Sequence, residues 1–202
     1  MRPLLPTSLH MIARSLQLFC VVLVCGAATV GLSNELKTGS VASLTFEDVD
    51  GNQLSTADGH VTIITVVTQS NGDQSRAIAD QVPDRYVGDP KYRYVTLVNF
   101  QGKLWGPLQG ITRGVIRGRL DGEAKEVKPQ YEAKHLTRDP RKDMYVIADF
   151  DGKAVTQLGL APESNEISVF VFDGRGKVVH RWNSVPPNDS LGNAIAAAAG
   201  AE

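Results

Sequence analysis

Cysteine is almost missing from this sequence, and both cysteines lie near its start. The chain of 202 residues contains two cysteines, Cys20 and Cys25, and none after them. Residues 34–202 therefore have no thiolate that attacks a substrate, exchanges a disulfide or binds a metal. They also cannot form a disulfide of their own, although an exported domain enters a compartment where disulfides persist. Thiol-dependent oxidoreductase or peroxidase activity is excluded for this part of the chain.

A surplus of charge of one sign is missing as well. Lysine and arginine together number 21, aspartate and glutamate 22, and the net charge is −1. The basic residues between Arg113 and Lys142 are interleaved with acidic ones, a pattern typical of a solvated helical face. Because a nucleic-acid surface is one-sidedly basic, we expect no nucleic-acid partner.

Metal-ligand patterns are also lacking. The histidines after the first 33 residues, His60, His135 and His180, are far apart in the sequence, and no cysteine joins them. Zinc sites in proteins usually combine closely spaced histidine and cysteine ligands. Asp-Gly pairs such as Asp151-Gly152 lack the full spacing of a calcium loop, in which a distant glutamate follows alternating ligands, and predict turns instead. We therefore expect no metal and no cofactor.

The first 33 residues predict a leader rather than a part of the fold. Arg2 and Arg14 are their only charged residues, an apolar run covers 16–25, and the small residues Gly26-Ala27-Ala28 follow. These are the three parts of a secretory signal peptide. We expect export to the periplasm or the outside, with cleavage after Ala28 or Ser33.

An uncleaved anchor is the alternative to a cleaved signal peptide. Residues 15–32 just reach the length of about 18 apolar residues that a spanning helix needs, so a membrane enters only if this segment is retained. Residues 34–40 then form a short linker, and residues 41–199 form one domain.

The first half of that domain predicts a hairpin, a buried strand and a helix. Residues 41–56 alternate around an Asp50-Gly51 turn, which is typical of a β-hairpin. Val61–Val67 is rich in β-branched residues on both faces, as in a central strand covered by helices. A helical pattern follows over 73–86, with Asp73 as its N-cap, and a second buried strand covers 92–100.

The second half alternates helices and strands and ends in a hairpin and a helix. Residues 106–137 look mainly helical and broken near Pro129, and glycine recurs every fourth residue at 106, 110, 114, 118 and 122. Because glycine is unfavourable in a helix, this stripe indicates either close packing of one helical face against the sheet or a partly irregular segment. The remaining elements are strands at 144–149, 167–173 and 177–183, a short helix at 153–158 and a helix at 190–199. This order predicts an α/β fold with a mixed sheet.

The order of elements resembles the thioredoxin-like superfamily, specifically its exported thiol:disulfide oxidoreductase and peroxiredoxin-like branch. Three stretches carry the resemblance: the hairpin at 46–55, the strand, turn and helix at 147–160, and the final hairpin at 169–179. The resemblance implies a thioredoxin-like fold, with a central mixed β-sheet flanked by helices and preceded by an N-terminal β-hairpin.

The same resemblance shows where the chemistry of the family has been lost. The family opens its first helix with Trp-Cys-x-x-Cys-Arg, and the matching residues here are Asn71, Gly72, Asp73, Gln74, Ser75 and Arg76. Gly72 stands in place of the attacking cysteine, Ser75 in place of the resolving cysteine, and Arg76 matches the arginine. The family also keeps a cis-proline before the first strand of its final hairpin, where this sequence has Ile167.

Two hypotheses about function follow. The first is a non-catalytic domain with a binding or structural role, which contacts a protein or a small molecule through residues 71–76 and Ile167. Helix N-termini favour anions, but helix capping alone also accounts for polar residues in such a loop. The second is an enzyme that uses Asp, His or Ser on the same scaffold, for instance Ser75 with His60 or His180. No Gly-x-Ser-x-Gly motif supports it, and we assign no catalytic residue.

Overall fold

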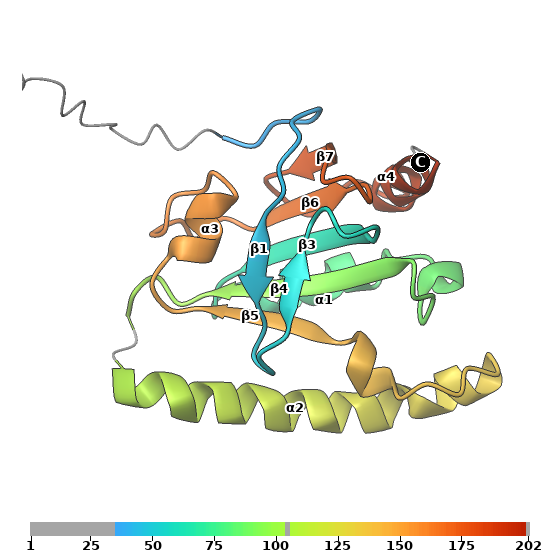
Figure 1. The fold of residues 1–202 in the computed structure, drawn as a ribbon. Helices are drawn as coiled ribbons and strands as arrows, with labels where there is room; N and C mark the ends of the chain where they lie inside the picture. Colours follow the sequence, from blue (N-terminus) through green and yellow to red (C-terminus); the bar gives the residue numbers. More distant parts are fainter. Residues whose placement is uncertain (1–34, 104–105, 201–202) are drawn as a thin grey trace, which may run out of the picture. The chain divides into compact units, whose positions relative to one another are not determined.

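The computed structural model describes residues 35–103 and 106–200. The predicted leader lies outside these residues. Five strands form the central sheet (Figure 1). The strand order is β5-β4-β3-β6-β7; β3, β4 and β5 run parallel, whereas β6 and β7 are antiparallel to their neighbours. Every residue of β3 is buried, which confirms the predicted central strand. The strands are β3 (Val61–Val67), β4 (Tyr92–Asn99), β5 (Tyr145–Asp149), β6 (Ser168–Phe172) and β7 (Val178–Trp182).

One face of this sheet is covered by the predicted hairpin and a short helix. Strands β1 (Thr45–Glu47) and β2 (Gln53–Ser55) pair antiparallel, and their central residues Phe46 and Leu54 lie opposite each other in the core. Asp48 closes the turn, because its carboxylate accepts the N–H groups of two later turn residues at 2.9 and 2.8 Å. Helix α3 (Lys153–Gln157) contributes buried side chains to the same core.

Three helices cover the opposite face. They are α1 (Gly72–Ala79), α2 (Gly106–Ala133) and α4 (Ser190–Ala199). Ile78 of α1 and Ile195 of α4 pack into one cluster with residues of β3 and β6, whereas Leu120 of α2 packs on Val146 of β5. None of the helices in the described ranges is long and apolar enough to span a membrane.

The first helix is shorter than its sequence pattern predicts. It ends at Ala79 instead of continuing to residue 86, and a separate 3-10 turn, η1 (Asp84–Tyr86), follows. Pro83 explains the break, because proline has no N–H to donate and disfavours the helical conformation in the preceding residue. The predicted N-cap is also wrong: Asn71 occupies that position, and Asp73 lies in the first turn, where a negative charge is favourable.

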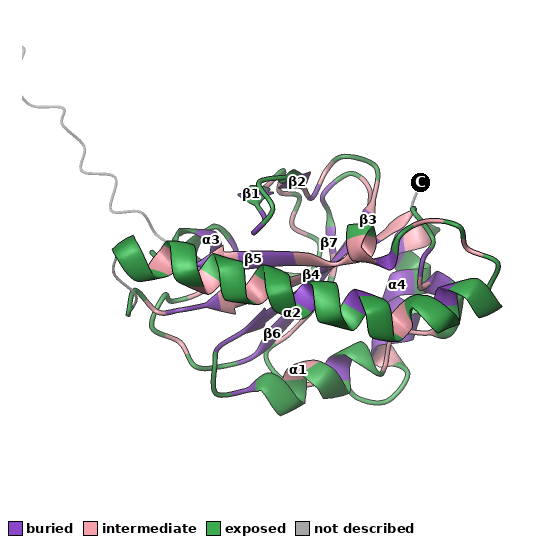
Figure 2. Ribbon diagram, turned by 90° about the horizontal axis from the view of Figure 1, so that it is seen from below, coloured by how far each residue is buried: buried purple, intermediate pink, exposed green. Residues whose placement is uncertain are grey.

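The longest helix differs from its prediction in two ways. It runs without a break from Gly106 to Ala133, and Pro129 lies inside it on an exposed side. Its five glycines do not pack against the sheet, because among the described residues no atom beyond the helix's own neighbouring turns lies within 4 Å of the position that a Cβ would take at any of them. The helix buries Leu120, Ala124 and Tyr131 instead, and Figure 2 shows most of its remaining surface exposed.

The start of the described chain is fixed at the edge of the sheet. Arg181 of β7 forms an ion pair with Glu35 at 2.9 Å and donates to the carbonyl of Leu36 at 3.0 Å. The N–H of Gly39 then donates to the carbonyl of Val178 at 2.7 Å. The segment before the hairpin therefore covers part of the open edge of β7.

Candidate functional site

The loop between β3 and α1 occupies the place where the thioredoxin-like resemblance locates the redox cysteines. Asn71 is buried there, and its side-chain oxygen accepts the N–H of Thr68 at 2.7 Å. Its amide nitrogen donates to the carbonyl of Asn165 at 3.2 Å. The structure thus brings together the two predicted halves of the site, residues 71–76 and the segment that precedes β6.

The remaining predicted residues differ in how accessible they are. Gly72, Asp73, Gln74 and Arg76 are exposed on the first turn and a half of α1, whereas Ser75 is half-buried. Ile167 is 4% exposed and packs in the core beside α1 and α4. Its side chain therefore belongs to the interior, and no peptide bond within the described ranges is cis.

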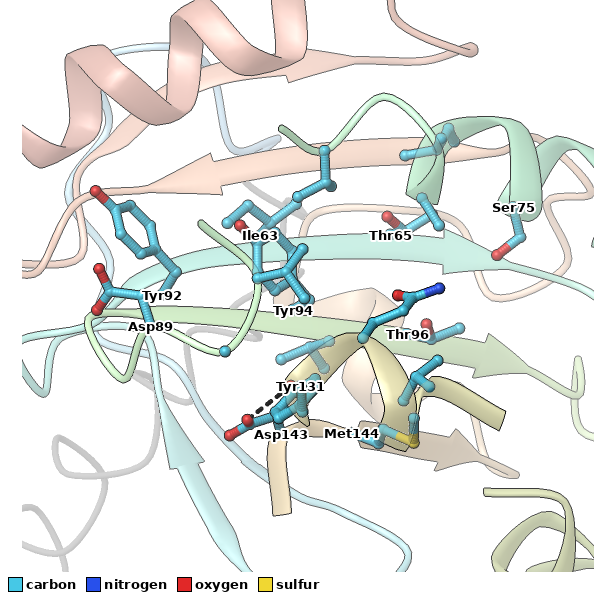
Figure 3. Close-up of a pocket in the computed structure, with 18 residues that line it drawn as sticks. Ile63, Thr65, Ser75, Asp89, Tyr92, Tyr94, Thr96, Tyr131, Asp143 and Met144 are labelled. Atoms are coloured by element: carbon cyan, nitrogen blue, oxygen red, sulfur yellow. Dashed lines mark hydrogen bonds between the residues drawn. The ribbon is translucent and has the colours of Figure 1, made fainter. Parts of the chain in front are cut away.

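Ser75 lines a partly open cavity of about 310 Å³ that lies on the β3–β4 face, between α1 and α2. Figure 3 shows the eighteen residues of its wall. The floor comes from alternate residues of the two strands, which pair as Ile63 with Tyr94 and Thr65 with Thr96. The cavity exists because α1 ends at Ala79 while α2 packs over β5, so the sheet between them is left without a covering helix.

Three hydroxyl groups gather at one end of this cavity. Thr65 and Thr96 are direct neighbours on the paired strands, and Ser75 faces them from α1 (Figure 3). Within the described part of the chain no side-chain hydrogen bond involves any of the three. Each hydroxyl can both donate and accept, so this end of the cavity offers unused hydrogen-bonding capacity.

The opposite wall holds tyrosine and carboxylate groups with shifted ionisation. Tyr131 donates from its hydroxyl to Asp143 at 2.8 Å, and Arg138 pairs with the same carboxylate. Burial raises the pKa of Asp143, and burial together with this carboxylate raises the pKa of Tyr131. Burial also raises the pKa of Tyr94 in the floor, whose shielded hydroxyl has no partner in the described ranges. Both phenols are therefore uncharged at neutral pH.

The charged side chains in the cavity wall are all acidic. They are the carboxylates Asp89 and Asp143, and none of the wall residues is a lysine, arginine or histidine. An anion in this cavity would lose water without gaining a counter-charge. The arrangement therefore favours an uncharged molecule.

The histidines do not join Ser75 in a catalytic arrangement. His60 precedes β3 and Ser75 follows it, so about seven residues of extended strand, roughly 20 Å, separate the two ends. His60 Nδ1 lies 2.8 Å from Asp58 Oδ1, and Arg93 donates to the other carboxylate oxygen at 2.9 Å. His180 packs in a tilted arrangement against Trp182 in β7, with ring centroids 4.0 Å apart. Among the described residues no cluster of three His, Cys, Asp or Glu side chains is placed to hold a metal.

Comparison with known proteins identifies the fold. No family model matches the sequence, and no curated protein matches it. A protein from Chlorobium tepidum described as a thiol:disulfide interchange protein, DsbE, is similar in structure over 82% of this chain and 100% of its own, at 18% identity and a TM-score of 0.50. BsSco, a member of the Sco family of cytochrome c oxidase assembly proteins, is similar over 82% and 96%, at 13% identity and the same TM-score.

These likenesses show that the chain has a thioredoxin-like fold. They confirm the predicted resemblance together with the central mixed sheet, its flanking helices and the N-terminal hairpin. The described residues of this chain contain no cysteine.

Ser75 is the one residue of the predicted set, 71–76 and Ile167, that lines the cavity between α1 and α2, and the other wall residues were not predicted. The floor of the cavity alternates in β4, where Tyr92, Tyr94 and Thr96 lie on one face. That alternation of aromatic and polar residues was a signal for a partly covered strand face. The early end of α1, marked by Pro83, was a second signal.

Proposed function

We propose that this domain is a non-catalytic binding module that takes a small, uncharged and largely apolar molecule into the cavity between α1 and α2. This proposal rests on the cavity itself, which has a volume of about 310 Å³ over the sheet and a mainly apolar wall. At one end of that wall are the hydroxyls of Thr65, Ser75 and Thr96, which form no side-chain hydrogen bond among the described residues. Ligand pockets typically have such a volume and combine apolar walls with a few polar groups. Burial of the exposed wall by an apolar ligand is favourable at roughly 25 cal/mol per Å².

The non-catalytic part of the proposal follows from the chemistry of the former redox loop. Gly72 has no side chain, and Ser75 has no base within hydrogen-bond reach in the described structure. A serine hydroxyl needs an adjacent base to act as a nucleophile. We also propose that the domain works outside the cytoplasm, on the strength of its signal-like first 33 residues.

Binding of an uncharged apolar dye tests the proposal. N-phenyl-1-naphthylamine fluoresces more strongly in apolar surroundings, and we expect a saturable rise in its fluorescence with the purified protein. Ala79→Trp fills the cavity from the end of α1 and abolishes this binding. Ala77→Trp is the matched control, because Ala77 is exposed on the same helix and does not line the cavity.

The two variants separate the outcomes. Loss of saturable dye binding in Ala79→Trp, with binding retained in Ala77→Trp, supports the proposal. Absence of saturable binding in the wild type, or equal binding in both variants, overturns it.

A further inference from the structure

We infer that the cavity selects an uncharged molecule with an oxygen-bearing head, such as an alcohol, ketone or amide, and that this head lies against Thr65, Ser75 and Thr96. The inference rests on the proposed function and adds the chemical class of the ligand and its orientation. It is carried by the distribution of polar groups along the cavity.

The pairing of β3 with β4 places the floor residues of the cavity side by side across the two strands. Ile63 pairs with Tyr94, and Thr65 pairs with Thr96 two residues further along both strands. Neighbouring strands lie about 4.8 Å apart, so the two threonine hydroxyls can reach one ligand oxygen together. The side chain of Ile63 and the ring of Tyr94 provide an apolar floor for the rest of the molecule, whereas the Tyr94 hydroxyl is shielded.

Ser75 completes the polar end from above. It lies on α1, one turn after Asn71, and Figure 3 shows its hydroxyl at the same end of the cavity as those of the two threonines. The hydrogen bonds of Asn71 to Thr68 and to the carbonyl of Asn165 fix the start of this helix. The position that the family uses for its second cysteine thus presents a hydroxyl to the cavity.

The head is uncharged for an electrostatic reason. The wall contains no cationic side chain, so a carboxylate or phosphate head would lose its water without gaining a counter-charge. A hydroxyl, carbonyl or amide head exchanges its hydrogen bonds to water for bonds to the three hydroxyls. A wholly apolar ligand leaves these hydroxyls without partners, which is unfavourable in a buried site.

A pair of isosteric probes tests the inference. Acetophenone and α-methylstyrene have nearly the same shape, but only acetophenone carries a carbonyl oxygen. We expect the wild type to bind acetophenone about 2- to 10-fold more tightly, as one or two hydrogen bonds would give, in titrations that displace N-phenyl-1-naphthylamine. Benzoate, the anionic analogue, binds more weakly than acetophenone.

The double variant Thr65→Val and Thr96→Val removes two hydroxyls while keeping β-branched side chains that suit a strand. It binds α-methylstyrene at least as well as the wild type and loses the preference for acetophenone. Thr62→Val is the matched control, because Thr62 lies in β3 but does not line the cavity. It keeps the preference.

The outcomes separate the inference from the proposed function. If both probes displace the dye equally from the wild type, or if the double variant keeps the preference, the inference is wrong while the binding module stands. If benzoate binds as tightly as acetophenone, the uncharged class is wrong. If no probe and no dye binds, both the inference and the proposed function are overturned.

Discussion

The amide nitrogen of Asn71 donates to the backbone carbonyl of Asn165 at 3.2 Å, across 94 positions of sequence. The same side chain accepts the N–H of Thr68, so one buried residue holds the loop after β3 against the segment before β6. In the family that the sequence resembles, these two segments carry the cysteine pair and the cis-proline. Here a structural hydrogen bond joins them.

Replacement of this asparagine should therefore weaken the fold. We expect Asn71→Ala to lower the free energy of unfolding by about 1–3 kcal/mol, because it removes two hydrogen bonds and leaves buried backbone groups unpaired. Urea denaturation measures the change. Gln74→Ala, at an exposed position three residues later, should change stability by less than about 0.5 kcal/mol. Equal effects of the two variants would contradict the assigned role.

Two glycine substitutions should act in opposite directions. Gly118 lies in the middle of α2 with open space around it, so Gly118→Ala should raise the free energy of unfolding by up to about 1 kcal/mol. Gly176 has a φ of +81°, and a Cβ there would lie 2.6 Å from the carbonyl oxygen of Ala42. Gly176→Ala should therefore destabilise the protein. Thermal melting distinguishes the signs, and a loss of stability in Gly118→Ala would mean that the glycine stripe has a packing role.

The carboxylate of Asp58 should give stability that depends on pH. Burial alone would raise its pKa, but hydrogen bonds from His60 and Arg93 outweigh burial and lower the pKa below its ordinary value. A lowered pKa gives stability that is present above the unfolded value of about 3.9 and lost as the pH falls through the folded value. Between pH 5 and pH 2 the wild type should lose more stability than Asp58→Asn.

Denaturant midpoints at several pH values measure this difference. Glu163→Gln is the control, since Glu163 is exposed and its side chain forms no ion pair within the described structure. It should titrate like the wild type. Parallel pH profiles of wild type and Asp58→Asn would show that the Asp58 network does not contribute.

Thiol chemistry should be absent from the domain and partly recoverable. With Cys20→Ser and Cys25→Ser in the predicted leader, we expect insulin reduction at background rate. Adding Gly72→Cys and Ser75→Cys places two thiols at C-x-x-C spacing on the N-terminus of α1, where thiolates are stabilised. This variant should reduce insulin above background, whereas Gly72→Cys alone, which has no resolving partner, should not. Activity in the cysteine-free chain would overturn the exclusion.

The sequence predicts the strands well because their signal is local. The β-branched run Val61–Val67 identifies the central strand, and the predicted helix at 190–199 is confirmed at both ends. The glycine stripe was misinterpreted for a physical reason. Because glycine has no side chain, the spacing of the glycines does not indicate which face of α2 is buried. The apolar side chains of Leu120 and Tyr131 define that face.

The cavity is harder to predict because it is a relationship between distant segments. Its walls come from α1, which ends at Ala79, and from the second half of α2, more than forty residues later. The pairing of Thr65 with Thr96 depends on the register between two strands. No local pattern in the sequence encodes that register, and so the polar end becomes visible only in the folded chain.

The ion pair of Arg181 with Glu35 and its hydrogen bond to Leu36 have a practical consequence. An affinity tag that replaces the predicted leader starts beside β7, and β6 separates that strand from the β3–β4 floor of the cavity. Immobilisation through such a tag would leave the opening between α1 and α2 free. Surface-based screening of small molecules against the tethered protein is therefore compatible with its architecture.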